Sequence, residues 1–270
     1  MKTMIIENNI NSIKLYDEMG VDRIFLDLEI LGKVKRQGHL NTVISTSHKL
    51  SDVKKISNSI KKADLLVRVN PINSNSPNEI NTCIKDGADI LMLPMFKTKN
   101  EVELFLNYVN GRVKTCLLLE TAEALCRVDD IVELSGVDEI YIGLNDLHLS
   151  MNLSFMFELL SGGIVDYLAH KFNSKNIPFG FGGIAALEDG LISGEMVLKE
   201  HTRLNSSMVI LSRSFKNYFN NDFSEFAKEH RKLKLKHKLF CESISQRELE
   251  LNKNKIKTLV SKIIKNKNCQ

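Results

Sequence analysis

Short apolar runs rich in β-branched residues recur along the chain, and segments with helical periodicity separate them. Eight of these runs are short enough to be single strands: Thr3–Glu7, Ile24–Leu28, Leu65–Asn70, Ile90–Pro94, Lys114–Glu120, Glu139–Leu144, Pro178–Ile184 and Ser207–Ser212. Their hydrophobicity is nearly continuous, which is typical of strands buried on both faces. The runs therefore predict a parallel sheet whose two faces are both covered.

Amphipathic segments lie between the apolar runs. Their periodicity predicts helices over Ile10–Met19, Leu50–Lys61, Asn78–Asp86, Lys99–Val109, Ala122–Leu134 and Phe155–Asn173, the last interrupted by Gly162-Gly163. Turns containing Gly20, Gly87 and Gly136 follow three helical segments, where glycine allows the left-handed conformation that ends a helix.

Eight strands alternating with helices predict a (β/α)8 TIM barrel over residues 1–220, because right-handed crossovers place successive strands side by side. An open, doubly wound sheet is the alternative. That fold usually has a phosphate-binding glycine turn after its first strand, and no such turn follows Thr3–Glu7. A ninth apolar run, Thr42–Ser47, does not fit the alternation and is assigned to a long loop after the second strand.

The amino-acid composition changes in residues 221–270, where apolar residues become sparse. Lysines accumulate there, namely Lys232, Lys234, Lys236, Lys238, Lys253, Lys255 and Lys257. A thin helical stripe of apolar residues predicts one or two helices appended to the barrel. The simpler interpretation of the lysines is a solvated cationic surface, and the alternative is an arm that docks on a neighbouring subunit. We expect a homo-oligomer.

Composition excludes several classes of protein. The 270 residues are 43% hydrophobic, and 37 basic against 33 acidic residues leave a net charge of only +4, too balanced for a typical nucleic-acid binder. No apolar run approaches the roughly 20 residues of a membrane helix, and the N-terminus lacks the pattern of a secretory signal. The five cysteines contain no CxxC pair, which argues against a disulfide framework or a zinc ribbon. We therefore expect a cytoplasmic protein without nucleic-acid or membrane partners.

Polar residues end four of the predicted strands, at the rim where barrel enzymes have their active sites. They are Asp27, Glu29, Arg68, Asn70, Glu120, Asn145 and Asp146. Glu120 and Asp146 follow neighbouring strands, and two carboxylates with several waters suit Mg²⁺. Arg68 can bind a substrate carboxylate through its two-pronged guanidinium. The structural alternative is a network of salt bridges around Arg68.

The last two predicted strands end in small and basic residues. Gly182 and Gly183 end the seventh strand, and Arg213 follows the eighth. Loops at these positions often bind phosphate in barrels, because glycines let backbone N–H groups approach an anion. A tight turn with Arg213 in a structural ion pair is the alternative.

Two longer stretches carry a family resemblance. Leu117–Ala124 (LLLETAEA), followed by Gly136–Leu147 (GVDEIYIGLNDL), resembles the HpcH/HpaI aldolase and citrate lyase β-subunit superfamily. Gly87–Pro94 is similar to that family's fourth strand, and Asp27-Leu28-Glu29 and Arg68-Val69-Asn70 are similar to its citrate-lyase-like branch. The resemblance extends over roughly residues 20–215.

The resemblance implies a (β/α)8 barrel that binds Mg²⁺, or Mn²⁺ or Co²⁺, through Glu120 and Asp146. It also implies that Arg68 anchors the carboxylate of a pyruvate-like substrate. From their places at the strand ends, we expect Asn70, Asn145, Gly182, Gly183 and Arg213 to be further substrate contacts. The expected function is a carbon–carbon lyase or aldolase that acts on a pyruvate-derived 2-oxo acid through a metal-stabilised enolate. The alternatives are a citrate-lyase-like acyl-CoA lyase and a barrel that only binds a metabolite.

The sequence departs from the family pattern at two positions. The aldolase branch has a histidine shortly after the acid of strand two, whereas Ile30 follows Glu29 here, and the residue two before the metal-binding glutamate is Leu118 in place of the frequent glutamine. The usual general base is therefore missing. The candidates for its role are His39, His48, His148 and Glu29, while Asp27 and Glu29 would support a water molecule or the metal's surroundings.

Overall fold

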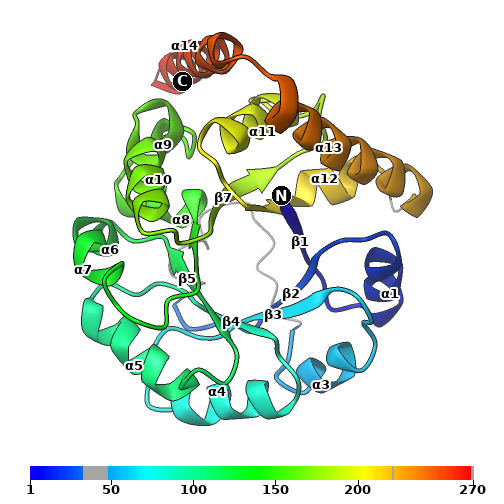
Figure 1. Cartoon of the computed structure of the whole chain (residues 1–270), viewed down its shortest axis with the longest axis vertical. Helices are drawn as coiled ribbons and strands as arrows, with labels where there is room; N and C mark the ends of the chain where they lie inside the picture. Colours follow the sequence, from blue (N-terminus) through cyan, green and yellow to red (C-terminus); the bar gives the residue numbers. More distant parts are fainter. Residues whose placement is uncertain (33–47, 221, 269–270) are drawn as a thin grey trace.

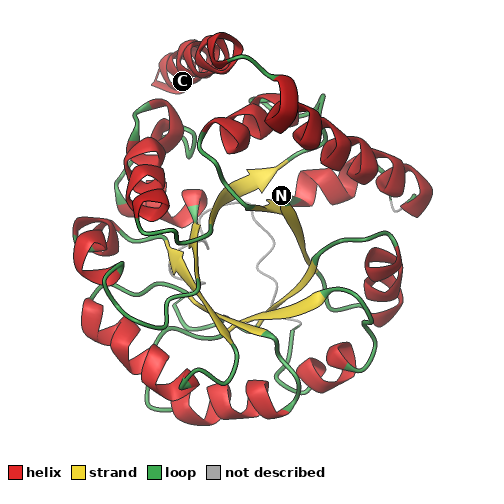
Figure 2. Ribbon diagram, viewed as in Figure 1, coloured by secondary structure: helices red, strands yellow, loops and turns green. Residues whose placement is uncertain are grey.

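The computed structural model describes residues 1–32, 48–220 and 222–268. Eight parallel strands close into a barrel in chain order, with the eighth strand paired to the first, so the predicted (β/α)8 fold is confirmed (Figures 1 and 2). The strands are β1 (Lys2–Ile6), β2 (Arg23–Asp27), β3 (Asp64–Arg68), β4 (Ile90–Leu93), β5 (Lys114–Leu119), β6 (Glu139–Ile142), β7 (Phe179–Ile184) and β8 (Met208–Leu211). Every predicted strand lies within two residues of these bounds.

Helices form an outer ring around the strands (Figure 2). Those of the barrel are α1 (Ile10–Glu18), α3 (Asp52–Ser57), α4 (Ser76–Lys85), α5 (Lys99–Val109), α6 (Ala122–Cys126), α7 (Val128–Ile131), α8 (Leu144–Ser150), α9 (Glu158–Ser161), α10 (Ile164–Ser174), α11 (Gly194–Arg203) and α12 (Arg213–Tyr218). The predicted helix Ala122–Leu134 is two short helices, because the backbone of Arg127 (φ −114°, ψ 12°) leaves the helical region between them. The predicted interruption at Gly162-Gly163 is confirmed. The run Thr42–Ser47 lies outside the described residues.

The glycine turns after three helices adopt the predicted left-handed conformation, with φ between 81° and 96° at Gly20, Gly87 and Gly136. Gly87 also lies against the side chain of Ser57, so a larger residue would collide there. These turns lead directly into β2, β4 and β6, and they therefore set where the strands begin.

Side chains alternate between the two sides of the strands. The inward set fills the barrel and consists of Met4, Phe25, Leu66, Ile90, Met92, Cys116, Leu118, Tyr141 and Met208. The outward set packs against the helices in a larger core. Both sets are buried, which explains why the strands appear in the sequence as unbroken apolar runs.

A buried ion pair closes the amino-terminal end of the barrel interior. Both Nη atoms of Arg23, on β2, lie 2.6 Å from the carboxylate oxygens of Glu139, on β6. The side chain of Arg23 is fully buried and that of Glu139 is 7% exposed. Because β2 and β6 are not neighbours in the barrel, this pair spans the interior.

The C-terminal extension consists of two long helices, α13 (Phe223–Ser243) and α14 (Gln246–Asn268), which lie across one side of the barrel (Figure 1). Lysines of both helices pair with carboxylates of the barrel: Lys232 with Glu188, Lys234 with Asp22, Lys236 with Glu195 and Lys253 with Asp166. These four lysines are partly exposed, between 29% and 50% of the side chain, so they are solvated and paired at the same time. Their charge joins the extension to its own barrel, and the expected homo-oligomer stays a prediction.

Buried histidines lie where the extension meets the barrel. His230 of α13 has Nε2 2.9 Å from the hydroxyl of Thr3, and burial lowers its pKa to about 4. His201 of α11 stacks on Phe181 with ring centroids 3.9 Å apart, and burial lowers its pKa to about 3. Both imidazoles are therefore neutral in the folded protein near pH 7.

Candidate active site

A cavity of about 330 Å³ opens at the carboxyl ends of the strands. Seven of the predicted site residues line it: Arg68, Glu120, Asn145, Asp146, Gly182, Gly183 and Arg213. Apolar side chains, among them Phe25, Leu118, Met156 and Ile210, form much of the remaining wall. A few polar groups thus share a largely apolar hollow, as is usual for small-molecule sites.

Arg68 is held in place by two carboxylates from β2 and the loop after it. Because β2 and β3 pair Asp27 with Arg68 in register, the guanidinium meets Asp27 in a two-pronged contact, with Nε and Nη2 each 2.8 Å from a carboxylate oxygen. Nη1 lies 3.4 Å from Glu29. Burial alone would lower the pKa of Arg68, but the neighbouring carboxylates outweigh it and raise the pKa well above its usual range. Arg68 is therefore a permanent, oriented cation at the cavity.

Glu120 follows β5 and is 2% exposed. The backbone N–H of Met95 donates to its Oε1 over 3.2 Å. On the other side, a Cβ atom at position 143 would lie 2.8 Å from Oε2, so the glycine at this position leaves the room that the carboxylate occupies. The β4 and β6 sides thus fix where the Glu120 carboxylate lies.

Asp146 reaches the cavity from a helix. The sequence placed Asn145 and Asp146 at the end of strand six, but the strand ends at Ile142 and both residues belong to the first turn of α8. Asp146 is 8% exposed and lines the same cavity as Glu120. The predicted convergence of the two residues on one cavity is therefore observed, although the element that carries Asp146 differs.

The oxygen atoms of Glu120 and Asp146 suit a hard divalent cation such as Mg²⁺, because that ion binds through one or two carboxylates and keeps several waters. Both carboxylates are buried in one cavity, where charged groups are stable only with compensation. Over residues 1–32, 48–220 and 222–268 there is no group of three or more His, Cys, Asp or Glu side chains placed to hold a metal ion. The fit therefore rests on these two carboxylates.

Asn70 is not among the residues that line the cavity. Its side-chain carbonyl accepts from the N–H groups of Ile30 and Leu31 at 3.0 and 3.1 Å, and its amide donates to Glu79 at 2.7 Å. These bonds tie the loop after β2 to β3 and α4. The structure places Asn70 behind the site as a support for that loop.

The histidine candidates for the general base also lie off the cavity wall. Nδ1 of His48 accepts from the backbone N–H of Asp27 over 2.9 Å, so a neutral His48 carries its proton on Nε2. His148 is buried in α8, with Nδ1 3.2 Å from the carbonyl of Leu144. His39 lies outside the described residues. Ile30 is 56% exposed.

Sequence reasoning missed Tyr141 and Lys216 in the cavity wall. Side chains alternate between the two faces of a strand, so Tyr141 lies on the same face as Gly143, two residues further on. This alternation is the signal that could have identified Tyr141. The ammonium of Lys216 lies 2.8 Å from Glu7 and donates to the carbonyl of Ile6 over 3.1 Å. Burial would raise the pKa of Glu7, but its contacts with Lys216 and two backbone N–H groups bring it below the usual range.

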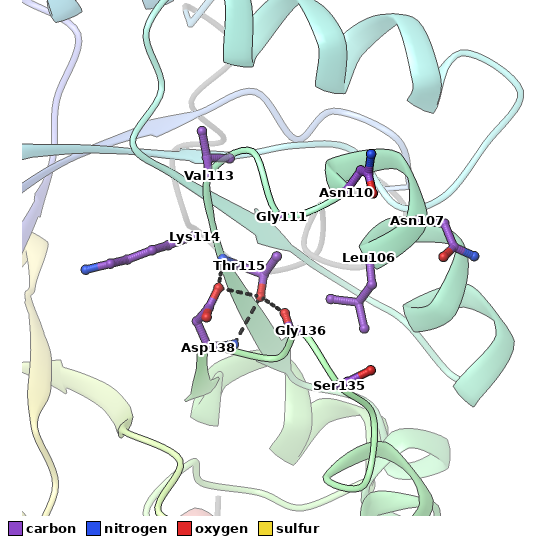
Figure 3. A pocket seen from close by; sticks show the side chains of 10 residues that line it. All are labelled: Leu106, Asn107, Asn110, Gly111, Val113, Lys114, Thr115, Ser135, Gly136 and Asp138. Atoms are coloured by element: carbon purple, nitrogen blue, oxygen red, sulfur yellow. Dashed lines mark hydrogen bonds between the residues drawn. The ribbon is translucent and has the colours of Figure 1, made fainter.

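A larger hollow of about 560 Å³ lies at the opposite end of the barrel, beside the starts of β5 and β6 (Figure 3). Its polar groups bond to one another: the hydroxyl of Thr115 donates to the carbonyl of Gly136 over 2.5 Å, and Asp138 accepts from the Thr115 N–H over 2.8 Å (Figure 3). These bonds fix the turn that enters β6. Size alone therefore does not identify the active site, because barrel enzymes have their active sites at the carboxyl ends of the strands and this hollow lies at the amino ends.

A model of the HpcH/HpaI aldolase/citrate lyase family matches residues 7–156, more than half of the 270 residues. The matched stretch includes Asp27, Arg68, Glu120 and Asp146. A hydroxypyruvate/pyruvate aldolase of Rhizorhabdus wittichii is 24% identical over 123 residues, an alignment that covers 36% of this chain and 49% of that relative. The chain thus spans about half the length of this curated relative.

Two solved structures share the fold. An HpcH/HpaI aldolase of Desulfitobacterium hafniense DCB-2 matches 83% of this chain and 92% of its own with a TM-score of 0.63 and 13% identity. An HpcH/HpaI aldolase/citrate lyase family protein of Burkholderia cenocepacia J2315 matches 85% of this chain and 94% of its own, also with a TM-score of 0.63 and 13% identity. At such low identity the likeness establishes the barrel and leaves the activity to other arguments. No helix within the described residues has the length and apolar character to cross a membrane.

Proposed function

Because the chain belongs to the HpcH/HpaI aldolase/citrate lyase family, a family of carbon–carbon lyases, we propose that it is a divalent-metal-dependent aldolase acting on a pyruvate-derived 2-oxo acid. One observation carries this proposal: Arg68, Glu120 and Asp146 line a single cavity at the carboxyl ends of the strands. The name of the Rhizorhabdus relative, a hydroxypyruvate/pyruvate aldolase, supports the same class of substrate.

Glu120 and Asp146 would hold the metal ion. A divalent ion bound there supplies Lewis-acid stabilisation of the negative charge that develops on the keto oxygen of the substrate. The Met95 N–H and the absent side chain of Gly143 keep the Glu120 carboxylate at a fixed place in the cavity. This preorganisation avoids rearrangement of the ligand during the reaction.

Arg68 would bind the substrate carboxylate. Two of the five N–H groups of its guanidinium donate to Asp27, which orients the fork, and Nη1 lies 3.4 Å from Glu29. The remaining donors would bind the substrate carboxylate. Asp27 and Glu29 then act through Arg68, as positioning residues. His48 acts one step further away, through the backbone of Asp27.

The size of the cavity favours a small 2-oxo acid over an acyl-CoA thioester. Its volume of about 330 Å³ lies near the lower end of the roughly 300–1,000 Å³ usual for ligand pockets. Its wall also includes the apolar side chains of Phe25, Leu118 and Met156, which reduce the contact of a bound substrate with water.

The test is exchange of the C3 protons of pyruvate for deuterium, followed by NMR with Mg²⁺, Mn²⁺ or Co²⁺. We expect metal-dependent exchange that is lost in Glu120→Gln and in Asp146→Asn. The matched control is Glu123→Gln, three residues beyond Glu120 on the exposed start of α6, where the carboxylate pairs with Lys97. Glu123→Gln is expected to exchange like the wild type.

Absence of exchange with all three metals would contradict the proposal. A rise in melting temperature with oxalate and metal, without exchange and without turnover of any aldol or acyl-CoA substrate, would instead identify a barrel that only binds a metabolite.

A further inference from the structure

Tyr141 forms part of the cavity wall at a place where the sheet is irregular. Between β7 and β8, Gly180 pairs with Met208 and Gly183 pairs with Ile210, so two residues of β7 oppose one residue of β8. Such a bulge interrupts the ladder of backbone hydrogen bonds. At Gly182 and Gly183, other hydrogen bonds must therefore replace the ladder and hold the cavity wall in place.

The hydroxyl of Tyr141, on the neighbouring strand β6, makes two such hydrogen bonds. It donates to the carbonyl of Gly182 and accepts from the N–H of Ile210 over 2.9 Å. One side chain thus joins β7 and β8 at the bulge. Tyr141 is only 1% exposed, so both backbone groups would lose their partner in a buried place if the hydroxyl were removed.

The glycines of β7 fit the phenol ring and the helix beyond it. A Cβ atom on Gly180 would lie 2.6 Å from Cε2 of Tyr141, and one on Gly182 would lie 2.8 Å from Cδ1 of Leu144. Gly182 also has a φ of +57°, which a side chain would strain. The ring, the bulge and Leu144 therefore pack in direct succession.

Leu144 connects this packing to the chemistry. It is the first residue of α8, two residues before Asp146 in the same turn. A shift of the bulge would remove the surface against which Leu144 rests, and Asp146 would move with its helix.

Tyr141 itself is unsuited to proton transfer. Burial raises the pKa of its hydroxyl well above the usual range, against the opposing effect of the hydrogen bond from Ile210. Its proton is also engaged with the Gly182 carbonyl.

We propose that Tyr141 is a positioning residue of the active site, which holds the β7 bulge against β8 and thereby seats Leu144 and the metal-side carboxylate Asp146. This inference rests on the function proposed above, because it takes Asp146 as a ligand of the metal. It assigns a role to a residue whose hydroxyl contacts neither of the two metal-side carboxylates.

The experiment compares wild type, Tyr141→Phe and the control Tyr167→Phe. Tyr167 lies on α10, is 43% exposed and has its ring 5.4 Å from the Lys171 ammonium. It is not among the residues that line the cavity. Three measurements are made on the full chain: the hydrogen-exchange protection of the Ile210 amide, the Kd for Mn²⁺, and the kinetics (kcat and KM) of pyruvate C3 exchange. Melting temperatures confirm that each variant is folded.

In Tyr141→Phe we expect the Ile210 protection to fall about tenfold and the Kd for Mn²⁺ to rise about tenfold, which is the scale of leaving buried polar groups unpaired. The KM for pyruvate should rise with the Kd while kcat changes less, because the metal site is displaced and the reacting groups are retained. Tyr167→Phe should match the wild type in all three.

Loss of Ile210 protection with unchanged Mn²⁺ affinity and unchanged kinetics would reduce Tyr141 to a structural residue and overturn the inference. Unchanged protection would overturn it as well. If wild type binds Mn²⁺ but shows no exchange of pyruvate, the proposed function fails, and protection together with Mn²⁺ affinity still decides the role of Tyr141.

Discussion

Two clusters of buried charge lie at opposite ends of the barrel interior, and they differ in balance and in surroundings. At the amino-terminal end the guanidinium of Arg23 shares two contacts of 2.6 Å with Glu139, and its Nε lies 3.9 Å from the partly exposed Asp64. At the carboxyl end the guanidinium of Arg68 faces Asp27, Glu29 and Glu120. The pair at the amino-terminal end, here called the lower pair or lower cluster, lies in packed core. The group around Arg68, here called the upper cluster, adjoins a cavity of about 330 Å³.

The difference shows that a buried ionisable residue is not by itself the mark of a site. Arg23 and Glu139 neutralise each other within packed core and close the amino-terminal end of the barrel. In the upper cluster, Arg68 and Glu120 both keep a surface on the cavity, where a ligand can meet them. Both clusters are buried and charged, so only the adjoining cavity distinguishes a candidate active site from a structural ion pair.

The largest effect is expected from breaking the lower pair. Arg23→Met leaves Glu139 buried without its partner, which should reduce the free energy of unfolding by about 3–5 kcal/mol. Urea unfolding measures it. The double variant Arg23→Met/Glu139→Leu should recover most of the loss, because it removes both charges. A double variant as unstable as the single one would show that the pair does more than neutralise itself.

A smaller effect is expected at the upper cluster, and it involves activity as well as stability. Arg68→Lys keeps the charge but loses the two-pronged geometry, so pyruvate C3 exchange should fall about 10- to 100-fold in kcat/KM. Lysine can still pair with Asp27 but loses one buried hydrogen bond to it, so the free energy of unfolding should fall by about 1–3 kcal/mol. Full exchange activity in Arg68→Lys would mean that the substrate carboxylate binds elsewhere.

The buried histidines sharpen the comparison, because they are uncharged where the two clusters are charged. His201 and His230 have pKa values lowered by burial to about 3 and about 4, whereas unfolded histidine titrates near 6.5. Below pH 6.5 the unfolded chain binds more protons, so stability should fall by about 1.4 kcal/mol per pH unit for each histidine as the pH drops towards 4. Urea unfolding at pH 7.5, 6 and 5 measures this slope.

The control for that slope is His201→Gln, which can keep a hydrogen bond to Ser206 but does not titrate. The His237 side chain and the N-terminal amine face His201, and Lys234 and Asp22 face His230. Burial also lowers the pKa of His237 to about 4, so loss of about a third of the slope in His201→Gln would agree with the assignment. An unchanged slope would assign the acid sensitivity to other groups.

The smallest effect is expected where the extension meets the barrel. Lys234 pairs with Asp22 over 2.7 Å at a side-chain exposure of 35%, and pairs that are open to solvent contribute little. Lys234→Met should change the unfolding free energy by less than about 1 kcal/mol and leave exchange of pyruvate unaltered. A loss of several kcal/mol would show that this pair behaves like the lower cluster.

The strands could be predicted because both of their faces are buried, which makes each one a short apolar run. Helix α11 was not predicted for the opposite reason. Its inner face carries the apolar residues Val197 and Leu198, but Glu200 and His201 are buried beside them with polar partners and interrupt the apolar stripe. Periodicity is a weak signal for a short helix whose buried face mixes apolar and charged residues.

The site was predictable as far as strand ends reveal it. Glu120, Asp146 and Arg68 were identified because polar residues after apolar runs must gather at one rim. Asn70 was not separable from them, since only tertiary contacts show that its amide serves the loop after β2. Tyr141 was hidden inside an apolar run, and its partners Gly182 and Ile210 come from strands far along the chain.

The central claim is that the upper cluster is a metal-dependent site for a 2-oxo acid and the lower cluster is not. The most direct test is a crystal structure of the protein soaked with Mn²⁺ and oxalate, an analogue of the pyruvate enolate. We predict an anomalous peak for Mn²⁺ between Glu120 and Asp146, with oxalate on the ion and against Arg68. Anomalous density elsewhere, or none at these two carboxylates, would contradict the claim.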